Sequence, residues 1–193
     1  MNFQNLSNLV KTTRCTRRFK PNIKISKKDL EEIIDITRIT SSAKNMQPLK
    51  YIIVNDKKLV NTLSSTAKWA AHLTSWEQSE SQRPSAFIII VNDTKIDGIS
   101  MVDAGISLQT IMLASRAKGY ASCTLASIDK EICIKEFKLD ESLQPMLGIA
   151  IGIEDEIINL VDTKDNDTNY YRNNKDEHCV PKRKLDEVLI GSY

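Results

Sequence analysis

The stretch that most constrains how this chain can fold is SSAKNMQPLKYIIV, from Ser41 to Val54, because the apolar period changes across it. The isoleucines before it, from Ile33 to Ile39, follow the spacing of one helix face, whereas Tyr51 to Val54 form a short β-rich run. Pro48 disfavours helical backbone at the residue before it. The pattern therefore predicts a helix, then a polar loop, then a buried strand.

The loop concentrates hydrogen-bonding side chains. Ser41, Ser42, Asn45 and Gln47 supply two hydroxyls and two carboxamides. Such a set can recognise a planar heterocycle whose donors and acceptors alternate. An ordinary turn uses the same residue types for local reasons. Taken by itself, the composition of the loop favours the ordinary turn, and the binding interpretation stays open.

Charge and cysteine content argue against several classes of protein. The 193 residues include 27 basic and 25 acidic side chains, so the net charge of +2 gives no reason to expect a nucleic-acid or membrane partner. No apolar run approaches the roughly 20 residues that cross a bilayer, and the N-terminus lacks the apolar core of a signal peptide. The cysteines form no CxxC pair and no zinc-type group: Cys15, Cys123, Cys133 and Cys179. We therefore expect one cytoplasmic domain, over residues 1–193, with neither metal nor disulfide.

The apolar periodicity along the chain predicts a mixture of helices and strands. Ser26 is expected to cap one helix and Gly119 to end another. The helix over 101–118 is apolar on most faces, which favours burial on several sides and a subunit interface. The predicted helices are Phe3 to Val10, 26–39, 59–72, 101–118 and a segment after Asp129; the predicted strands are 51–54, 87–91, 120–126 and 147–153.

Two segments permit alternative interpretations. Residues 66–85 hold Trp69 and Trp76, which suit either a movable lid over a pocket or a plug at the edge of a core. The sequence from Glu154 onward is too poor in apolar residues to fold alone, so we expect it to lie against another surface.

Basic side chains gather near both ends of the chain. Arg14 and Arg17 are three residues apart, so both guanidinium groups can reach one phosphate. A solvated basic cap is the alternative. A second basic cluster, Pro181 to Lys184, precedes the apolar run from Leu185 to Ile190, and it suits either a phosphate contact or a nucleic-acid or solubility patch.

In order and spacing, these stretches resemble the flavin-dependent nitroreductase family over essentially the full chain. Arg14 to Phe19, RCTRRF, is similar to the family signature R-S-x-R-x-F, with Cys15 in place of serine. Ser41 to Leu49 is similar to the family loop P-S-x-x-N-x-Q-P-W, with serine in place of proline and leucine in place of tryptophan. The resemblance implies an α+β sandwich, with a mostly antiparallel sheet flanked by helices, in an intertwined homodimer.

The resemblance also implies a bound FMN and assigns its contacts. Those near the phosphate and pyrimidine are Arg14, Cys15, Thr16 and Arg17, with Arg17 beside flavin N1 and O2; Ser41, Ser42, Asn45 and Gln47 would come from the partner subunit. Thr124, Leu125, Ala126 and Ser127 match the segment whose backbone N–H meets flavin N5, where many members have a Glu-Gly pair. Lys182 or Arg183 would return to the phosphate from a tail, about 154–193, that wraps the partner.

The function implied is reduction of a small oxidised acceptor, such as a nitroaromatic or a quinone, by NADH or NADPH through the flavin. No side chain need act as a nucleophile or general base, so no catalytic residue is assigned. The alternatives are a flavin-binding module without turnover and a member that acts on an enone or a halogenated aromatic. The sequence does not distinguish these acceptors or the two nicotinamides.

Overall fold

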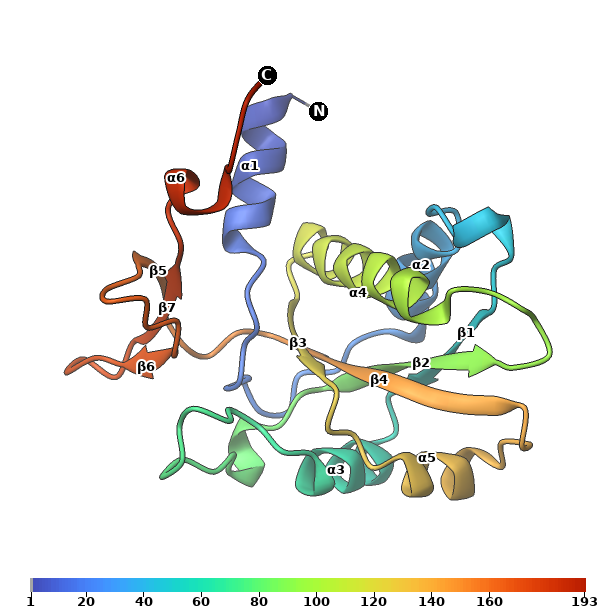
Figure 1. The fold of residues 1–193 in the computed structure, drawn as a ribbon. Helices are drawn as coiled ribbons and strands as arrows, with labels where there is room; N and C mark the ends of the chain where they lie inside the picture. Colours follow the sequence, from blue (N-terminus) through green and yellow to red (C-terminus); the bar gives the residue numbers. More distant parts are fainter. Residues whose placement is uncertain (1) are drawn as a thin grey trace. The chain divides into compact units, whose positions relative to one another are not determined.

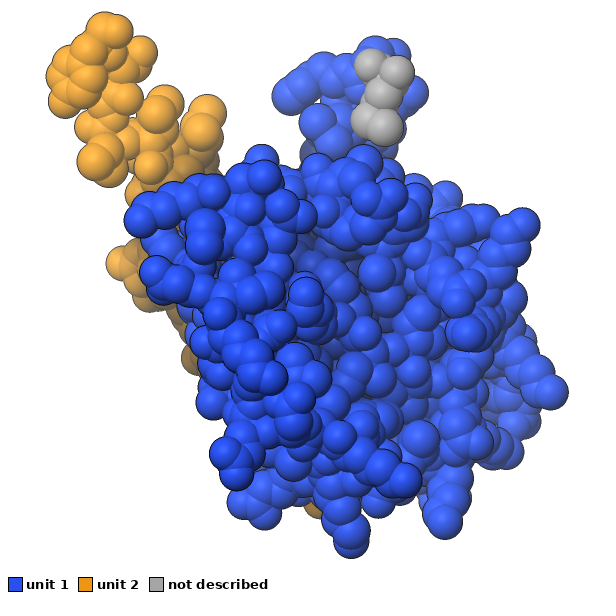
Figure 2. Space-filling view, turned by 90° about the vertical axis from the view of Figure 1, so that its right-hand side faces the viewer, with its two compact units in different colours: residues 1–69, 78–155 blue, residues 70–77, 156–193 orange. Residues whose placement is uncertain are grey.

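The computed structural model describes residues 2–193, which divide into two compact units. The first comprises residues 2–69 and 78–155, and the second comprises Ala70–Glu77 and Glu156–Tyr193. Figure 2 shows them in different colours. Among the described residues, no helix combines the length and the apolar character needed to cross a bilayer.

A four-stranded antiparallel sheet forms the centre of the first unit. Its strand order is β1-β2-β4-β3, so β2 and β4 are the inner strands. Six consecutive residues of β2, from Ala86 to Val91, are buried, as expected of a strand that is covered on both faces. The strands are β1 (Leu49–Val54), β2 (Ala86–Asp93), β3 (Ala121–Leu125) and β4 (Leu143–Gly152). This architecture confirms the predicted α+β class with an antiparallel sheet.

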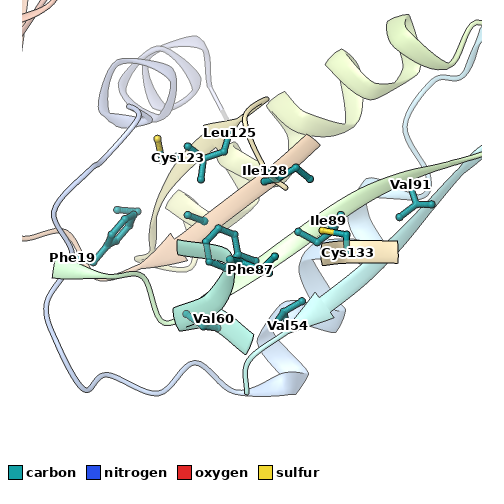
Figure 3. Close-up of a cluster of buried hydrophobic side chains, with 13 residues drawn as sticks. Phe19, Val54, Val60, Phe87, Ile89, Val91, Cys123, Leu125, Ile128 and Cys133 are labelled. Atoms are coloured by element: carbon teal, nitrogen blue, oxygen red, sulfur yellow. The ribbon is translucent and has the colours of Figure 1, made fainter. Parts of the chain in front are cut away.

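Helices cover both faces of this sheet (Figure 1). Successive residues of β2 point to opposite faces, so Ile88 and Ile90 pack with α2 and α4, whereas Phe87 and Ile89 pack with α3 and α5. Figure 3 shows the second of these clusters. The helices of the first unit are α1 (Phe3–Thr12), α2 (Lys27–Thr37), α3 (Lys57–Thr66), α4 (Ser100–Ala117) and α5 (Lys130–Phe137), with short 3-10 turns at η1 (Ala43–Asn45) and η2 (Glu80–Gln82).

Side-chain caps determine where several helices begin. The Ser26 hydroxyl accepts a hydrogen bond from the backbone N–H of Asp29 at 3.0 Å, which confirms the predicted cap of α2. The helix predicted over 59–72 is wrong beyond Thr66. There the Trp69 indole donates to the carbonyl oxygen of Ser64 at 2.9 Å, and the backbone at Ala67 is extended. The indole therefore satisfies a carbonyl that a longer helix would have bonded internally.

Strand β4 has a face of small residues, and an aromatic ring lies against one of them, Gly152. A Cβ atom at Gly152 would lie 2.5 Å from Cδ1 of Phe19, which is fully buried. The segment that carries Phe19 is extended, not helical. Gly152 therefore makes room for the end of the signature segment 14–19.

The second unit contains a three-stranded sheet, β5 (Ile158–Asp162), β6 (Tyr171–Arg172) and β7 (His178–Lys182), in the order β5-β7-β6. Apolar periodicity did not predict these strands, because polar contacts hold much of the unit together. Arg172 pairs with Glu156 at 2.5 Å, and Asn159 and Asn173 both donate to the Glu177 carboxylate. A short helix, α6 (Leu185–Val188), follows β7.

Candidate cofactor site

The basic segment after α1 lies along the outer edge of strand β3. Cys15 forms a β-bridge with Ser122, and the backbone N–H of Thr16 donates to the Ser122 carbonyl at 2.9 Å. Further along, Lys20 N–H donates to the Ile153 carbonyl at 2.8 Å. These bonds fix the segment beside the first residues of β3, the strand whose far end the resemblance places at the flavin.

Arg14 and Arg17, in this segment, differ in burial and in hydrogen bonding. Arg17 is 9% exposed and donates from Nη1 to the Cys15 carbonyl at 3.1 Å. Arg14 is half-buried; its Nη2 donates to the Val10 carbonyl at 2.7 Å, while its buried Nε has no acceptor within the described residues. A buried donor without an acceptor costs about 1–3 kcal/mol, so an anionic ligand at Arg14 would recover that energy. This orphaned donor fits a phosphate contact.

The electrostatic environment of Cys15 also favours negative charge. A hydrogen bond from the Cys123 thiol lowers the pKa of the Cys15 thiol to about 6, helped by the backbone of Thr124 and by the charges of Arg17 and Arg14, although burial opposes the shift. Arg14 and Arg17 therefore supply positive charge beside Cys15, which also suits an anionic ligand.

Thr16 and the residues at the end of β3 have internal partners in one chain. The buried Thr16 hydroxyl donates to Glu154 Oε1 at 3.0 Å. Thr124 donates to Met112 Sδ at 3.4 Å, Leu125 is in the core, and Ser127 donates to the Lys68 carbonyl at 2.8 Å. The Thr16 contact is therefore structural, and at 124–127 backbone groups, including that of exposed Ala126, are the better candidates for cofactor contacts.

The polar loop is organised by an aspartate that sequence reasoning missed. Asp103, in the first turn of α4 and 3% exposed, accepts from the Ser42 hydroxyl at 2.5 Å and from the Ala43 N–H at 2.8 Å. The Ser42 oxygen in turn accepts from the Gln47 N–H at 2.9 Å. One signal was available, since Asp103 is an acidic residue inside a helix that is apolar on most faces.

The loop also lines a small cavity of about 220 Å³. Three predicted residues line it together with residues of β1 and α4: Ser41, Ser42, Gln47, Tyr51, Asp103 and Ser107. The exposed Asn45 is not among the lining residues, and it accepts from Gln47 Nε2 at 3.2 Å through both its backbone and side-chain oxygens. Lys44, Asn45 and Gln47 all have positive φ angles, near 55°, which few non-glycine residues adopt. Such conformations persist where surrounding contacts enforce them.

One chain does not bring the predicted contacts together. Asp103 fixes the loop at the start of α4, whereas the segment with Cys15 pairs with β3, which follows the end of α4 (Figure 1). The 18 residues of α4 span about 27 Å. Lys182 and Arg183 belong to the second unit, where Arg183 donates to Asn166 Oδ1 at 2.9 Å, so their contact with a phosphate stays a prediction.

Comparison with known proteins gives the family. A model of the nitroreductase family matches residues 10–153, a range that contains the signature segment, the polar loop and strand β3. The chain belongs to the nitroreductase family. Membership confirms the resemblance inferred from the sequence and makes the protein an oxidoreductase.

Individual members of the nitroreductase family are similar over most of their length. A 4-nitrobenzoate reductase of Pseudomonas putida is 25% identical in an alignment that covers 77% of this chain and 85% of the relative. A nitroreductase family protein of Clostridium difficile 630 has the same fold, with a TM-score of 0.66 and 24% identity over 81% of this chain and 87% of that chain. An FMN-dependent nitroreductase of Clostridium difficile R20291 has a TM-score of 0.64 and 22% identity, over 77% of this chain and 87% of that chain.

In this nitroreductase, Asp103→Asn is expected to loosen the polar loop. The carboxylate accepts two hydrogen bonds, and an amide can replace only one of these acceptors, so we expect unfolding to cost about 1–3 kcal/mol less. Urea denaturation measures this change. Asp97→Asn, at an exposed position near the same helix, serves as the control and should leave the stability unchanged. Equal stability of both variants would show that Asp103 does not hold the loop.

Proposed function

We propose that this nitroreductase binds FMN and uses NADH or NADPH to reduce a small oxidised acceptor, such as a nitroaromatic or a quinone. When bound, FMN would supply the hydride transfer between nicotinamide and acceptor. The observation that carries the proposal is the cationic edge of β3: Arg14 has a buried donor without an acceptor among the described residues, and Arg14 and Arg17 both lower the pKa of the Cys15 thiol. The Pseudomonas relative, a 4-nitrobenzoate reductase, supports the acceptor class, and the second Clostridium structure, an FMN-dependent nitroreductase, supports the cofactor.

The residues at this edge have distinct proposed roles. Arg14 would hold the FMN phosphate through its Nε donor. Arg17, buried and hydrogen-bonded to the Cys15 carbonyl, would provide fixed positive charge where the flavin becomes negative on reduction. The backbone between Thr124 and Ser127 would cover the flavin near N5. No side chain in this assignment has to transfer a proton or form a covalent bond.

The site is proposed to be completed by a second copy of the chain. The loop with Ser42 and Gln47 lies at the far end of α4 from Arg14 within one chain, so a flavin that contacts both needs the loop of a partner. Exposed apolar side chains support such an interface. No residue of α1 within its bounds is buried, and Phe3 on α1 and Met101 on α4 are 83% and 69% exposed. A homodimer would cover these surfaces.

Anaerobic reduction tests the proposed activity. The purified protein is expected to be yellow, and NADH or NADPH should bleach the visible absorbance of its flavin. A nitroaromatic or quinone added next should restore the colour. A flavin that neither nicotinamide bleaches would identify a binding module without turnover, and a protein that binds no FMN would overturn the cofactor assignment.

A further inference from the structure

Two cysteines that are far apart in sequence lie side by side at the edge of β3. Cys15 forms a β-bridge with Ser122, so its backbone runs next to that of Cys123. Both side chains pack in the same core cluster, and the Cys123 thiol is hydrogen-bonded to the Cys15 sulfur. Neighbouring strands lie about 4.8 Å apart and each residue advances about 3.3 Å along a strand, so Cα atoms one residue out of register lie roughly 5.8 Å apart. A disulfide needs Cα atoms roughly 4.4–6.8 Å apart. The two sulfurs can therefore be joined with little movement of the backbone.

The environments of the two thiols suit different roles. Cys15 is half-buried and has Arg14 and Arg17 beside it, which lower its pKa and favour the nucleophilic thiolate, whereas Cys123 is 3% exposed. An accessible thiolate with a protected second thiol next to it is the arrangement of redox-active pairs. Cys133 contrasts with Cys15, because burial raises its pKa to about 11.

We propose that Cys15 and Cys123 form a dithiol that a hydroperoxide oxidises reversibly to a disulfide. This revises the expectation, based on sequence spacing, that the chain forms no disulfide. The pair does not depend on a bound flavin, so it goes beyond the proposed function. In a reducing compartment, disulfides of this kind are transient and signal or catalyse redox change.

The reaction balances with one peroxide. The Cys15 thiolate attacks one peroxide oxygen, the O–O bond breaks, and the leaving hydroxide takes a proton to become water, which leaves a sulfenic acid on Cys15. The Cys123 sulfur then attacks the Cys15 sulfur. The S–S bond forms as the S–O bond breaks, and the hydroxyl leaves with the thiol proton as a second water. Two thiols lose two electrons and the peroxide gains them.

Thiol counting on the purified, reduced protein tests this proposal. The described chain has four free cysteines. One equivalent of hydrogen peroxide should lower the count by two per chain, and dithiothreitol should restore it. Peptide mapping by mass spectrometry without reduction should then find the Cys15 peptide joined to the Cys123 peptide, and a non-reducing gel should show that the link lies within one chain.

Serine variants assign the two roles. C15S should keep all three of its remaining thiols, whereas C123S should lose one of its three and accumulate a Cys15 sulfenic acid that dimedone traps. C133S is the matched control and should lose two thiols at the wild-type rate. The proposal would be overturned if wild type gave no joined peptide, or if it trapped as much dimedone at Cys15 as C123S does. Peptide mapping uses the wild-type protein alone, so that test does not depend on whether a variant folds.

Discussion

Replacing Arg14 and Arg17 together with alanine is expected to weaken FMN binding at least about 100-fold. Hydrogen bonds to charged groups contribute about 1.5–3 kcal/mol each, so the loss of two amounts to at least about 3 kcal/mol. Arg14 is the stronger candidate for the phosphate because it is less buried than Arg17, so a ligand can reach its Nε, which has no acceptor among the described residues. Fluorescence titration of the flavin-free protein with FMN measures the change.

Riboflavin, which lacks the phosphate, separates the two arginines. Arg14→Ala should weaken FMN binding and leave riboflavin binding unchanged, whereas Arg17→Ala should weaken both. K11A/K20A is the matched control, because it removes the same charge from exposed positions beside the segment and should bind FMN as wild type does. Arg17→Lys retains the charge if the alanine variant fails to fold. Equal FMN affinity in R14A/R17A and wild type would contradict the phosphate assignment.

Mixing two variants tests whether a partner completes the site. S42A/Q47A is expected to lose FMN through the loop, and R14A/R17A through the basic segment. In a mixed dimer one site carries both defects and the other carries neither, so random mixing should restore roughly one site in four. A site built within one chain would regain nothing. Recovery of flavin on mixing therefore separates the two arrangements.

Gly152→Val is expected to destabilise the first unit by about 3 kcal/mol. A Cβ atom there would lie 2.5 Å from Cδ1 and 3.0 Å from Cγ of Phe19, well inside contact distance. Phe19 has no room to move, since its ring is fully buried and its backbone N–H is bonded to the Gln82 carbonyl at 3.0 Å. Overpacking of this kind typically costs about 1–3 kcal/mol, and a rigid neighbour puts the cost at the upper end. Urea denaturation measures the loss.

A second substitution identifies the cause of that loss. F19L in the Gly152→Val background should recover part of the stability, because the smaller side chain relieves the overlap. Gly105→Ala on α4 is the control, since a Cβ atom there meets nothing within 4 Å and alanine is the better helix former. A Gly152→Val protein as stable as wild type would mean that Phe19 can shift after all.

Local rules predicted much of the first unit. The Ser26 cap, the buried run before Val91 and the apolar helix over 101–118 follow from periodicity and capping, which depend on neighbours in sequence. The order and spacing of four motifs together indicated the family. Helix α3 shows the limit of such rules, because the Trp69 indole ends it at a point that helix propensity does not mark.

Contacts between distant residues account for what the sequence did not predict. Asp103 meets Ser42 across about 60 residues, and Cys15 meets β3 across more than 100, so neither pairing is visible in local spacing. The positive φ angles of the polar loop are enforced by these contacts, not by glycine. The strands of the second unit lack apolar alternation, because carboxylate and amide side chains bond across them.

Strand β3 is the last strand of its sheet, and its outer edge would otherwise present free N–H and C=O groups. The hydrogen bond from Thr16 to the Ser122 carbonyl covers part of that edge. Exposed strand edges recruit strands from other molecules. A chain shortened to begin beyond Phe19 should therefore aggregate through β3 before its loss of cofactor binding could be measured. The basic segment thus protects solubility as well as providing the proposed phosphate contact.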